Sequence, residues 1–319
     1  MIMSIRVMHH VSDGLSNDAK VLFNTIPNIQ IKCYPEADIL KETPLCMERV
    51  DIHIFLEHLY EYALSFATMT CFIPNMEWLN GKDLRLLTKY PDITIIAKTK
   101  YARDILCKRF GPRVRYTGWD SIDMHNNNES KSNQWLHLKG VSPFKHTQAV
   151  LNVWMKHPEW PVLHIVAHGD DKKNGFITLA HSVNVTPNIV LYQYKLDHDV
   201  LVGMMNRCAY HICPSQVEGF GHYINEGLST NATVITTDGA PMNELVTDAR
   251  CLIPCRLSHM MNLGMSFEFS EESLELVLKN VIENDLRCFH SRTEFINRRH
   301  SFAHEFKSLI ACISITQCV

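Results

Sequence analysis

Three features are scarce in this 319-residue chain: net charge, long apolar runs and paired metal-ligand motifs. Lys and Arg total 31 against 34 Asp and Glu, and this net charge of −3 argues against a general nucleic-acid binder. No run of roughly 18 or more apolar residues is present, so we expect no membrane-spanning helix. His9 and His10 fall where a secretion signal would need apolar residues. We therefore expect a cytoplasmic protein.

The cysteines form neither a disulfide framework nor a metal site by their spacing. The 11 Cys are an odd number scattered through the chain, which is typical of buried free thiols. Cys208 and Cys213, or Cys251 and Cys255, lie close in sequence but form no CxxC pair, and the 18 His include no HExxH. The DxD at 197–199 opens a predicted helix, where acidic residues are ordinary. We expect no metal and no other cofactor.

What the chain does have is a composition that can bury a core, with 46% hydrophobic and 20% charged residues, so general disorder is excluded. Its first half alternates short apolar runs with polar segments, as in a βα pattern. We expect residues 12–20 to form a polar loop and 101–110 a helix that ends at Gly111. The expected strands of this half are residues 4–8, 51–56, 70–73, 93–97 and 114–117.

The second half is more regular and predicts a parallel sheet covered by helices on both faces, a Rossmann-like arrangement. A polar, Asn-rich stretch at 121–134 is the expected linker. The expected strands are 135–138, 162–167, 188–192, 209–213 and 234–237, and the expected helices are 144–156, 197–207 and 222–229. We therefore predict an α/β protein with two Rossmann-like domains, 1–130 and 131–295, and a cleft between them.

Residues 213–246 carry the strongest chemical signal. After a predicted strand, Glu218, Gly219 and Gly221 precede a helix whose first N–H groups suit a phosphate, and glycine lets the backbone approach a ligand. Glu226 follows eight positions after Glu218, on the helix. A carboxylate can accept hydrogen bonds from two sugar hydroxyls. The segment therefore suits a phosphate with a sugar on either side.

The same stretch, PSQVEGFGHYINE, resembles the donor-sugar signature of GT-B glycosyltransferases, most closely the retaining family 4 type within glycosyl transferases group 1. The following VITTDGAPMNE resembles the next strand and Glu-containing turn of that family, with Glu244 at the Glu position. WLHLKGVSPFKHTQAVLNVW resembles the strand and loop that supply the family's diphosphate-binding Lys, here Lys145. The resemblance extends over about residues 135–247, and 296–319 resembles the final helix that crosses back to the N-terminal domain.

The resemblance implies a GT-B fold and a hexosyl-type glycosyltransferase that uses a nucleotide-diphosphate sugar as co-substrate, with retention and without a metal. It makes Glu218 the catalytic residue at the transferred sugar and Glu226 the residue that binds the ribose. Many family members have an Arg a few residues before this Lys. In this chain the corresponding residues, 140–144, include no cationic side chain. The implied donor-binding set is Lys145, Gly219, Phe220, Gly221, His222, Glu226 and Glu244.

In the first half, loops that follow strands should face the cleft. The acceptor, whether a glycan, a lipid or a protein, is not indicated by the sequence. Two other functions also remain open: a nucleotide-sugar epimerase or phosphorylase, and a catalytically silent nucleotide-sugar binding protein. The expected cleft residues are Asp13, Gly14, Glu57, His58, Asn75, Glu77 and Lys98. As catalytic groups, His10 and His58 are less favoured, because 18 His give many coincidences.

Residues 98–115 hold seven cations and a single acidic residue, Asp104. Either a membrane-facing or anion-binding patch or a solvated helix face explains this composition. Trp119 is expected to pack in the core.

Overall fold

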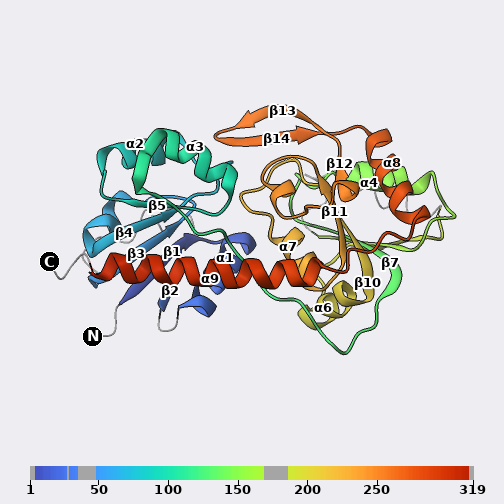
Figure 1. Ribbon diagram of the computed structural model, residues 1–319, viewed down its shortest axis with the longest axis horizontal. Coiled ribbons are helices and arrows are strands. Elements are labelled where there is room, and N and C mark those ends of the chain that lie inside the picture. The colour runs from blue at the N-terminus through green and yellow to red at the C-terminus, as the bar shows by residue number, and fades with distance from the viewer. Residues whose placement is uncertain (1–3, 27–28, 35–47, 169–185, 316–319) are drawn as a thin grey trace. The chain divides into compact units, whose positions relative to one another are not determined.

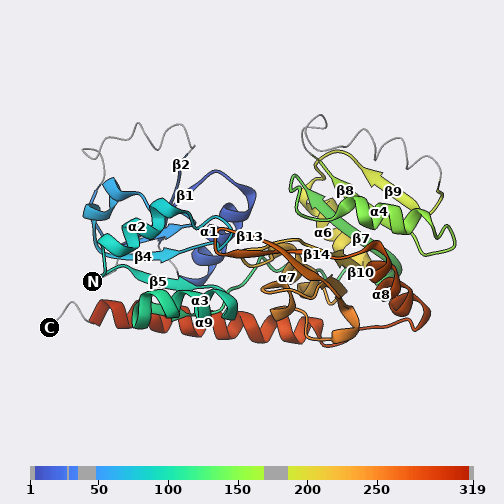
Figure 2. The same cartoon turned by 90° about the horizontal axis from the view of Figure 1, so that it is seen from above.

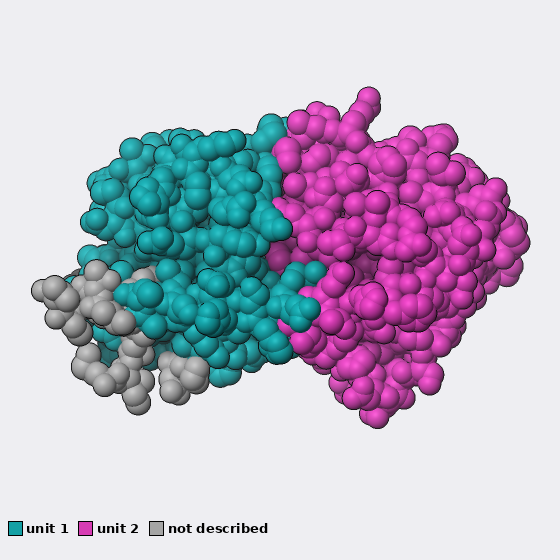
Figure 3. Space-filling model, in the orientation of Figure 1, with its two compact units in different colours: residues 1–122, 260–264, 297–319 teal, residues 123–259, 265–296 magenta. Residues whose placement is uncertain are grey.

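The computed structural model describes residues 4–26, 29–34, 48–168 and 186–315 (Figure 1). The chain divides into two compact units, coloured separately in Figure 3. Unit 1 comprises Met1–Ile122, Met260–Gly264 and Asn297–Val319, and unit 2 comprises Asp123–His259 and Met265–Ile296. Among the described residues, none of the helices combines the length and apolar character that a membrane crossing requires.

Unit 1 is built on a parallel six-stranded sheet in the order β2-β1-β3-β4-β5-β6. The direction of strand order reverses between β1 and β3, which is the topological switch point of such a sheet. The strands are β1 (Ile5–His10), β2 (Ile29–Tyr34), β3 (Val50–Leu56), β4 (Ala67–Ile73), β5 (Thr94–Ala97) and β6 (Val114–Tyr116). The helices that follow them are α1 (Asp13–Thr25), α2 (Gly81–Lys89) and α3 (Lys100–Phe110).

The strands of unit 1 are short β-branched runs that are buried on both faces, as in other parallel sheets. Val7, Ile52 and Ile54 are each at most 1% exposed. The prediction of a loop at residues 12–20 is wrong, because α1 begins at Asp13. Ser12 caps this helix by accepting a hydrogen bond from the Leu15 amide. Apolar residues at helical spacing form one face of the helix, which packs against the core.

Unit 2 contains a second parallel six-stranded sheet, in the order β12-β11-β10-β7-β8-β9. This is the doubly wound order, and the strand order reverses between β7 and β10. The strands are β7 (Ser132–Gly140), β8 (Leu163–Ala167), β9 (Ile189–Tyr192), β10 (Cys208–Cys213), β11 (Thr233–Thr237) and β12 (Leu252–Ile253). The helices are α4 (Thr147–Met155), α6 (His198–Arg207), α7 (His222–Ser229) and α8 (Glu271–Glu283).

Aromatic packing holds the central strands of unit 2 together. The Trp135 ring on β7 stacks on the Tyr210 ring of β10, with centroids 4.3 Å apart, and both residues are buried. The predicted helix at 144–156 is shorter than expected and starts at Thr147, because His146 has a left-handed backbone with φ 45°. The loop that carries Lys145 is thereby kept outside the helix.

The predicted elements of the second half did not include strand β12, the β-hairpin of β13 (Arg256–Met261) and β14 (Gly264–Glu268), or helix α8; the hairpin and α8 are visible in Figure 2. The last helix, α9 (Ser291–Ile315), covers residues 296–315 of the predicted C-terminal helix, and 316–319 lie outside the described residues. Its first residues belong to unit 2 and its remainder to unit 1.

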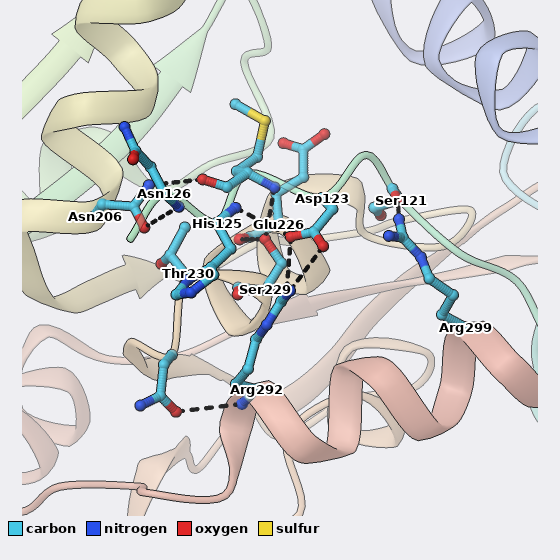
Figure 4. Close-up of polar contacts among 12 residues, drawn as sticks. Ser121, Asp123, His125, Asn126, Asn206, Glu226, Ser229, Thr230, Arg292 and Arg299 are labelled. Atoms are coloured by element: carbon cyan, nitrogen blue, oxygen red, sulfur yellow. Dashed lines mark hydrogen bonds and ion pairs between the residues drawn. The ribbon is translucent and has the colours of Figure 1, made fainter. Parts of the chain in front are cut away.

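Within unit 2, Arg292 of α9 forms a bidentate ion pair with Asp123, at 2.5 and 2.9 Å, and donates to the Ser229 carbonyl (Figure 4). The Ser229 hydroxyl in turn donates to the Glu226 carbonyl at 2.7 Å and accepts from the Met124 amide. The chain that enters unit 2 is therefore bonded to the carboxyl end of α7, which holds the helix that bears Glu226.

Candidate functional site

In unit 2, the loop after β7 and the loop after β10 meet at the carboxyl edge of the sheet. These two strands are the neighbours between which the strand order reverses, and ligands bind doubly wound sheets at this place. The Gln216 amide donates to the Phe144 carbonyl at 2.9 Å, so the two loops are joined through their backbones. The Phe267 amide donates to the Gln216 carbonyl at 2.8 Å and adds a third segment.

Four polar side chains form one connected cluster at this edge. The Lys145 ammonium pairs with the Glu218 carboxylate, and their side chains are only 13% and 15% exposed. The Ser215 hydroxyl lies 2.5 Å from Glu218 Oε1 and 2.6 Å from the Tyr223 hydroxyl. Lys145 Nζ also lies 3.6 Å from the centre of the Tyr223 ring, a close cation–π contact. The structure thus brings together Lys145 and Glu218, which the sequence selected from segments 73 residues apart.

Burial raises the pKa of the Tyr223 phenol well above its usual value, and the neighbouring Cys213 and Glu218 add to the effect. The phenol therefore keeps its proton throughout the neutral range. A protonated phenol next to Ser215 can donate a hydrogen bond within the cluster or to a ligand oxygen.

The turn that starts α7 has the geometry expected of a glycine-dependent phosphate loop. Gly221 is the N-cap and has φ +100°, a backbone conformation that other residues rarely adopt. A Cβ at this position would lie 3.1 Å from Ile224 Cδ1. His222 is the first residue of the helix, and the first amides of a helix have no acceptor within it. Gly219 and Phe220 are buried in the preceding turn.

Glu226 lies on α7, one turn after its start, and Glu244 ends a short 3-10 helix at Met242–Glu244; both residues are partly buried. The pKa of the Cys213 thiol, at the end of β10, is raised first by burial and then by the charges of Glu218 and Glu226. Both carboxylates therefore act electrostatically on the same strand end.

In unit 1, the expected cleft residues after β3 and β4 are in direct contact. Asn75 Nδ2 donates to Glu57 Oε2 at 2.6 Å, and Glu57 Oε1 lies 3.4 Å from His10 Nε2. His58, next in the chain, contacts Asp83 through its Nδ1 at 2.9 Å. Burial alone would lower the pKa of His58, but the hydrogen bond and charge of Asp83, with the charge of Glu57, outweigh it and raise that pKa.

The network continues to the end of β5. Lys98 Nζ donates to Asn75 Oδ1 at 2.9 Å and to Asp18 Oδ2 at 2.5 Å. The side chains of this ion pair are each 2% exposed, and Trp119 Nε1 donates to the second Asp18 oxygen at 2.6 Å. Trp119 is 2% exposed, as expected for a core residue.

Asp13 and Gly14 lie exposed in the first turn of α1, just after β1. Glu77 is 7% exposed, and its carbonyl accepts from Asn262 Nδ2 at 2.7 Å. The cationic segment 98–115 is only partly a surface patch: Lys98 is buried, and Arg113 donates to the carbonyls of Leu87 and Tyr90.

Several members of these clusters were not selected from the sequence. Tyr223 lies inside the recognised stretch but is one of several aromatic residues there, and Asp18 and Asp83 belong to helices with ordinary polar sequences. The partners of Asp18 and Asp83 lie far away in the chain, so no local spacing indicates these two residues. For Ser215 the sequence does offer a signal, because this residue lies in the loop that follows the end of β10 at Cys213.

A family model described as "Glycosyl transferases group 1" matches residues 121–265, which include the whole cluster around Lys145 and Glu218. No curated protein sequence matches the chain. Many solved structures resemble it, at low identity.

The sucrose-phosphate synthase of Thermosynechococcus elongatus is 10% identical with a TM-score of 0.71, over 99% of this chain and 100% of that one. Anabaena HepE in complex with UDP and glucose is 10% identical with a TM-score of 0.66, over 98% and 100%. The pneumococcal O-GlcNAc transferase GtfA in complex with UDP and GlcNAc is 13% identical with a TM-score of 0.64, over 87% of this chain. The chain spans only 59% of the length of that transferase. These likenesses confirm the predicted α/β GT-B fold.

Proposed function

Residues 121–265 form a glycosyl transferases group 1 domain within a GT-B fold, and from this premise we propose that the protein transfers a sugar from a nucleotide-diphosphate sugar to an acceptor. The observation that carries the proposal is the cluster of Lys145, Ser215, Glu218 and Tyr223 at the switch point of the sheet. Structures with the same fold hold UDP, as in the Anabaena and pneumococcal complexes.

The diphosphate is proposed to bind at the start of α7. The glycine turn at 219–221 leaves the first helix amides available, and the positive end of the helix favours an anion. We propose that Lys145 changes partner when the donor binds. Glu218 neutralises its charge in the structure, and the diphosphate would compete for the same ammonium. Glu226, further along α7, is proposed to accept hydrogen bonds from the ribose hydroxyls.

Catalysis is proposed to rest on charge stabilisation. As the sugar–phosphate bond breaks, negative charge builds up on the leaving diphosphate, and Lys145 and the α7 amides are already positioned in a partly buried site. Glu218, released from Lys145 by the donor, would accept hydrogen bonds from the transferred sugar. Because cationic and backbone donors neutralise the diphosphate, we propose that the donor binds without a divalent metal. Retention of the anomeric configuration is proposed on the family resemblance.

The proposal is tested first by binding. A ligand that binds only the folded state raises the melting temperature, so UDP, GDP, ADP and their sugars are compared as additives, each with and without EDTA. We expect one nucleotide diphosphate to raise the midpoint equally in both buffers. The Lys145→Ala variant should lose this rise, whereas Lys156→Ala, which removes an exposed Lys at the end of α4, should keep it.

The second step is turnover with the donor so identified and a panel of acceptors. Conversion of the donor sugar without an acceptor would favour an epimerase. Donor binding with neither transfer nor conversion would favour a silent binding protein. A midpoint rise that requires Mg²⁺ or Mn²⁺ would contradict the metal-free donor site.

A further inference from the structure

Three potential metal-ligand atoms converge at the switch point of unit 1. His10 follows the core of β1, and Glu57 and His58 follow β3, so the strand ends bring them to one edge of the sheet. His10 Nε2 lies 3.4 Å from Glu57 Oε1, and His58 Nε2 lies 3.9 Å from the same oxygen. The three ligand atoms lie within 4.8 Å of one another.

The other polar atoms of two of these side chains are already engaged. His58 Nδ1 lies 2.9 Å from Asp83 Oδ2, which can only accept, so the neutral ring carries its proton on Nδ1 and presents the Nε2 lone pair to a metal. Glu57 Oε2 accepts from Asn75 at 2.6 Å, so Oε1 is the oxygen that faces the histidines. A carboxylate behind a ligating histidine and a hydrogen bond to a ligating carboxylate are the usual outer contacts of a metal site.

The backbone at Glu57 supports a specialised role for this residue. Its φ of 68° lies in the left-handed region, which a non-glycine residue rarely enters because the backbone is strained there. The Glu57 amide donates to the Ile73 carbonyl at 2.9 Å, which holds the turn against β4. Such strain is found where a side chain must be placed in a particular position.

We propose that His10, Glu57 and His58 bind one divalent metal ion, with Zn²⁺ as the preferred ion because two imidazoles and one carboxylate are typical zinc ligands. Zinc bonds of about 2.0–2.1 Å place tetrahedral ligands roughly 3.3 Å apart. The His10–Glu57 spacing already fits. The His58 ring, 28% exposed, needs a small rotation. The remaining coordination position would take a water.

The residues of this site belong to unit 1, whereas those of the proposed donor site belong to unit 2. It does not depend on the proposed function and is tested without turnover. Asp248, Cys251 and Cys288 form a second group of potential ligands in unit 2. Metal binding to this second group is the competing explanation. Its thiols would give bound cobalt a distinct charge-transfer band, so the spectrum distinguishes the two sites.

The experiment measures metal binding directly. The purified full chain is stripped with EDTA, dialysed and titrated with ZnSO₄ in a calorimeter, and with CoCl₂ followed by visible absorption. We expect one zinc per chain, and a cobalt spectrum with nitrogen and oxygen ligands but no thiolate charge-transfer band. Each of His10→Ala, His58→Ala and Glu57→Gln should weaken zinc binding at least about 10-fold, and Asp83→Asn about 10- to 100-fold through the His58 contact.

The control is His259→Ala, which removes an exposed histidine of β13 and should bind zinc as the wild type does. Thermal melts in EDTA confirm that each variant is folded. No zinc uptake by the wild type would overturn the proposal. So would a thiolate band, or unchanged binding in a folded His10→Ala/His58→Ala double variant.

Discussion

Lys145, in the loop after β7, forms an ion pair with Glu218, in the loop after β10, across the point where the strand order of unit 2 reverses. The two side chains are only 13% and 15% exposed, so separating them would leave two poorly solvated charges that favour new partners. A diphosphate for Lys145 and sugar hydroxyls for Glu218 are partners of the right chemistry. Donor binding should therefore exchange this pair for two ligand contacts.

The first prediction concerns the cation. Lys145→Ala should weaken binding of the nucleotide diphosphate roughly 10- to 150-fold, the range that corresponds to a charge-assisted hydrogen bond of about 1.5–3 kcal/mol. Calorimetric titration with the diphosphate measures the dissociation constant. Lys156→Ala provides the matched control, and a Lys145→Ala variant with wild-type affinity would refute the assignment.

The second prediction concerns the turn before α7. Gly221→Ala should lower the free energy of unfolding by about 1–2 kcal/mol, because alanine is strained at φ +100° and its Cβ would crowd Ile224. Gly14→Ala is the matched control. It lies in a helix with nothing within 4 Å of an added Cβ, so it should leave stability unchanged or raise it. Urea unfolding distinguishes the two, and equal stabilities would argue against the glycine requirement.

The third prediction concerns the buried ion pair of unit 1. Lys98→Ala should destabilise the protein by about 3–5 kcal/mol, because it leaves the Asp18 carboxylate buried beside Trp119 without its cation. The adjacent surface change Lys100→Ala should have little effect. Thermal and urea melts provide the comparison, and similar melting of the two variants would show that the pair contributes little.

The fourth prediction is a pH dependence that arises at His137 on β7. Its Nδ1 lies 2.8 Å from the Ile212 carbonyl and its Nε2 lies 2.8 Å from the Thr147 hydroxyl, so the ring is held neutral between β10 and the start of α4. Burial of the imidazole ring is the main reason why the pKa of His137 is lowered from 6.5 to about 4. The unfolded chain therefore binds a proton that the folded chain rejects between these two values.

Stability should accordingly be complete above about pH 6.5 and fall as the pH is lowered towards 4, by at most about 3 kcal/mol from this residue. His137→Gln, which has no titrating ring, should show a shallower decline over the same interval in melts from pH 7 to 4. An identical slope in the two proteins would assign the acid sensitivity elsewhere. His211 is a further contributor, because burial also lowers its pKa, to about 3.

The sequence predicted the parts of the fold that local patterns determine. The runs at 51–56 and 209–213 are strands because all their side chains except that of Asp51 are buried, and a parallel sheet leaves no polar face. Helix α1 was missed, because its exposed face is so polar that the segment looks like a loop. The start of α4 was misplaced because the left-handed turn at His146 has no signature in its sequence.

The site was predictable to a similar extent. The motif around Glu218 and the loop with Lys145 could be selected because both resemble the donor-site signature of a known family, and the glycines and carboxylates at 218–226 also suit a phosphate beside a sugar. The contacts of unit 1 could not, since Lys98 meets Asp18 at a separation of 80 residues and His58 meets Asp83 at 25. Only the rule that strand ends share an edge placed Glu57 and Asn75 together.

The most direct test of the donor site is the kinetic comparison of Glu226→Ala with Glu218→Ala, at saturating acceptor and with the donor varied. The ribose barely changes during the reaction, so loss of its carboxylate contact should raise KM for the donor roughly 10- to 150-fold with little change in kcat. Glu218 is proposed to contact the sugar where its bond to phosphate breaks, so its loss should lower kcat. Equal effects of the two variants on KM and kcat, or wild-type kinetics in either folded variant, would contradict the account.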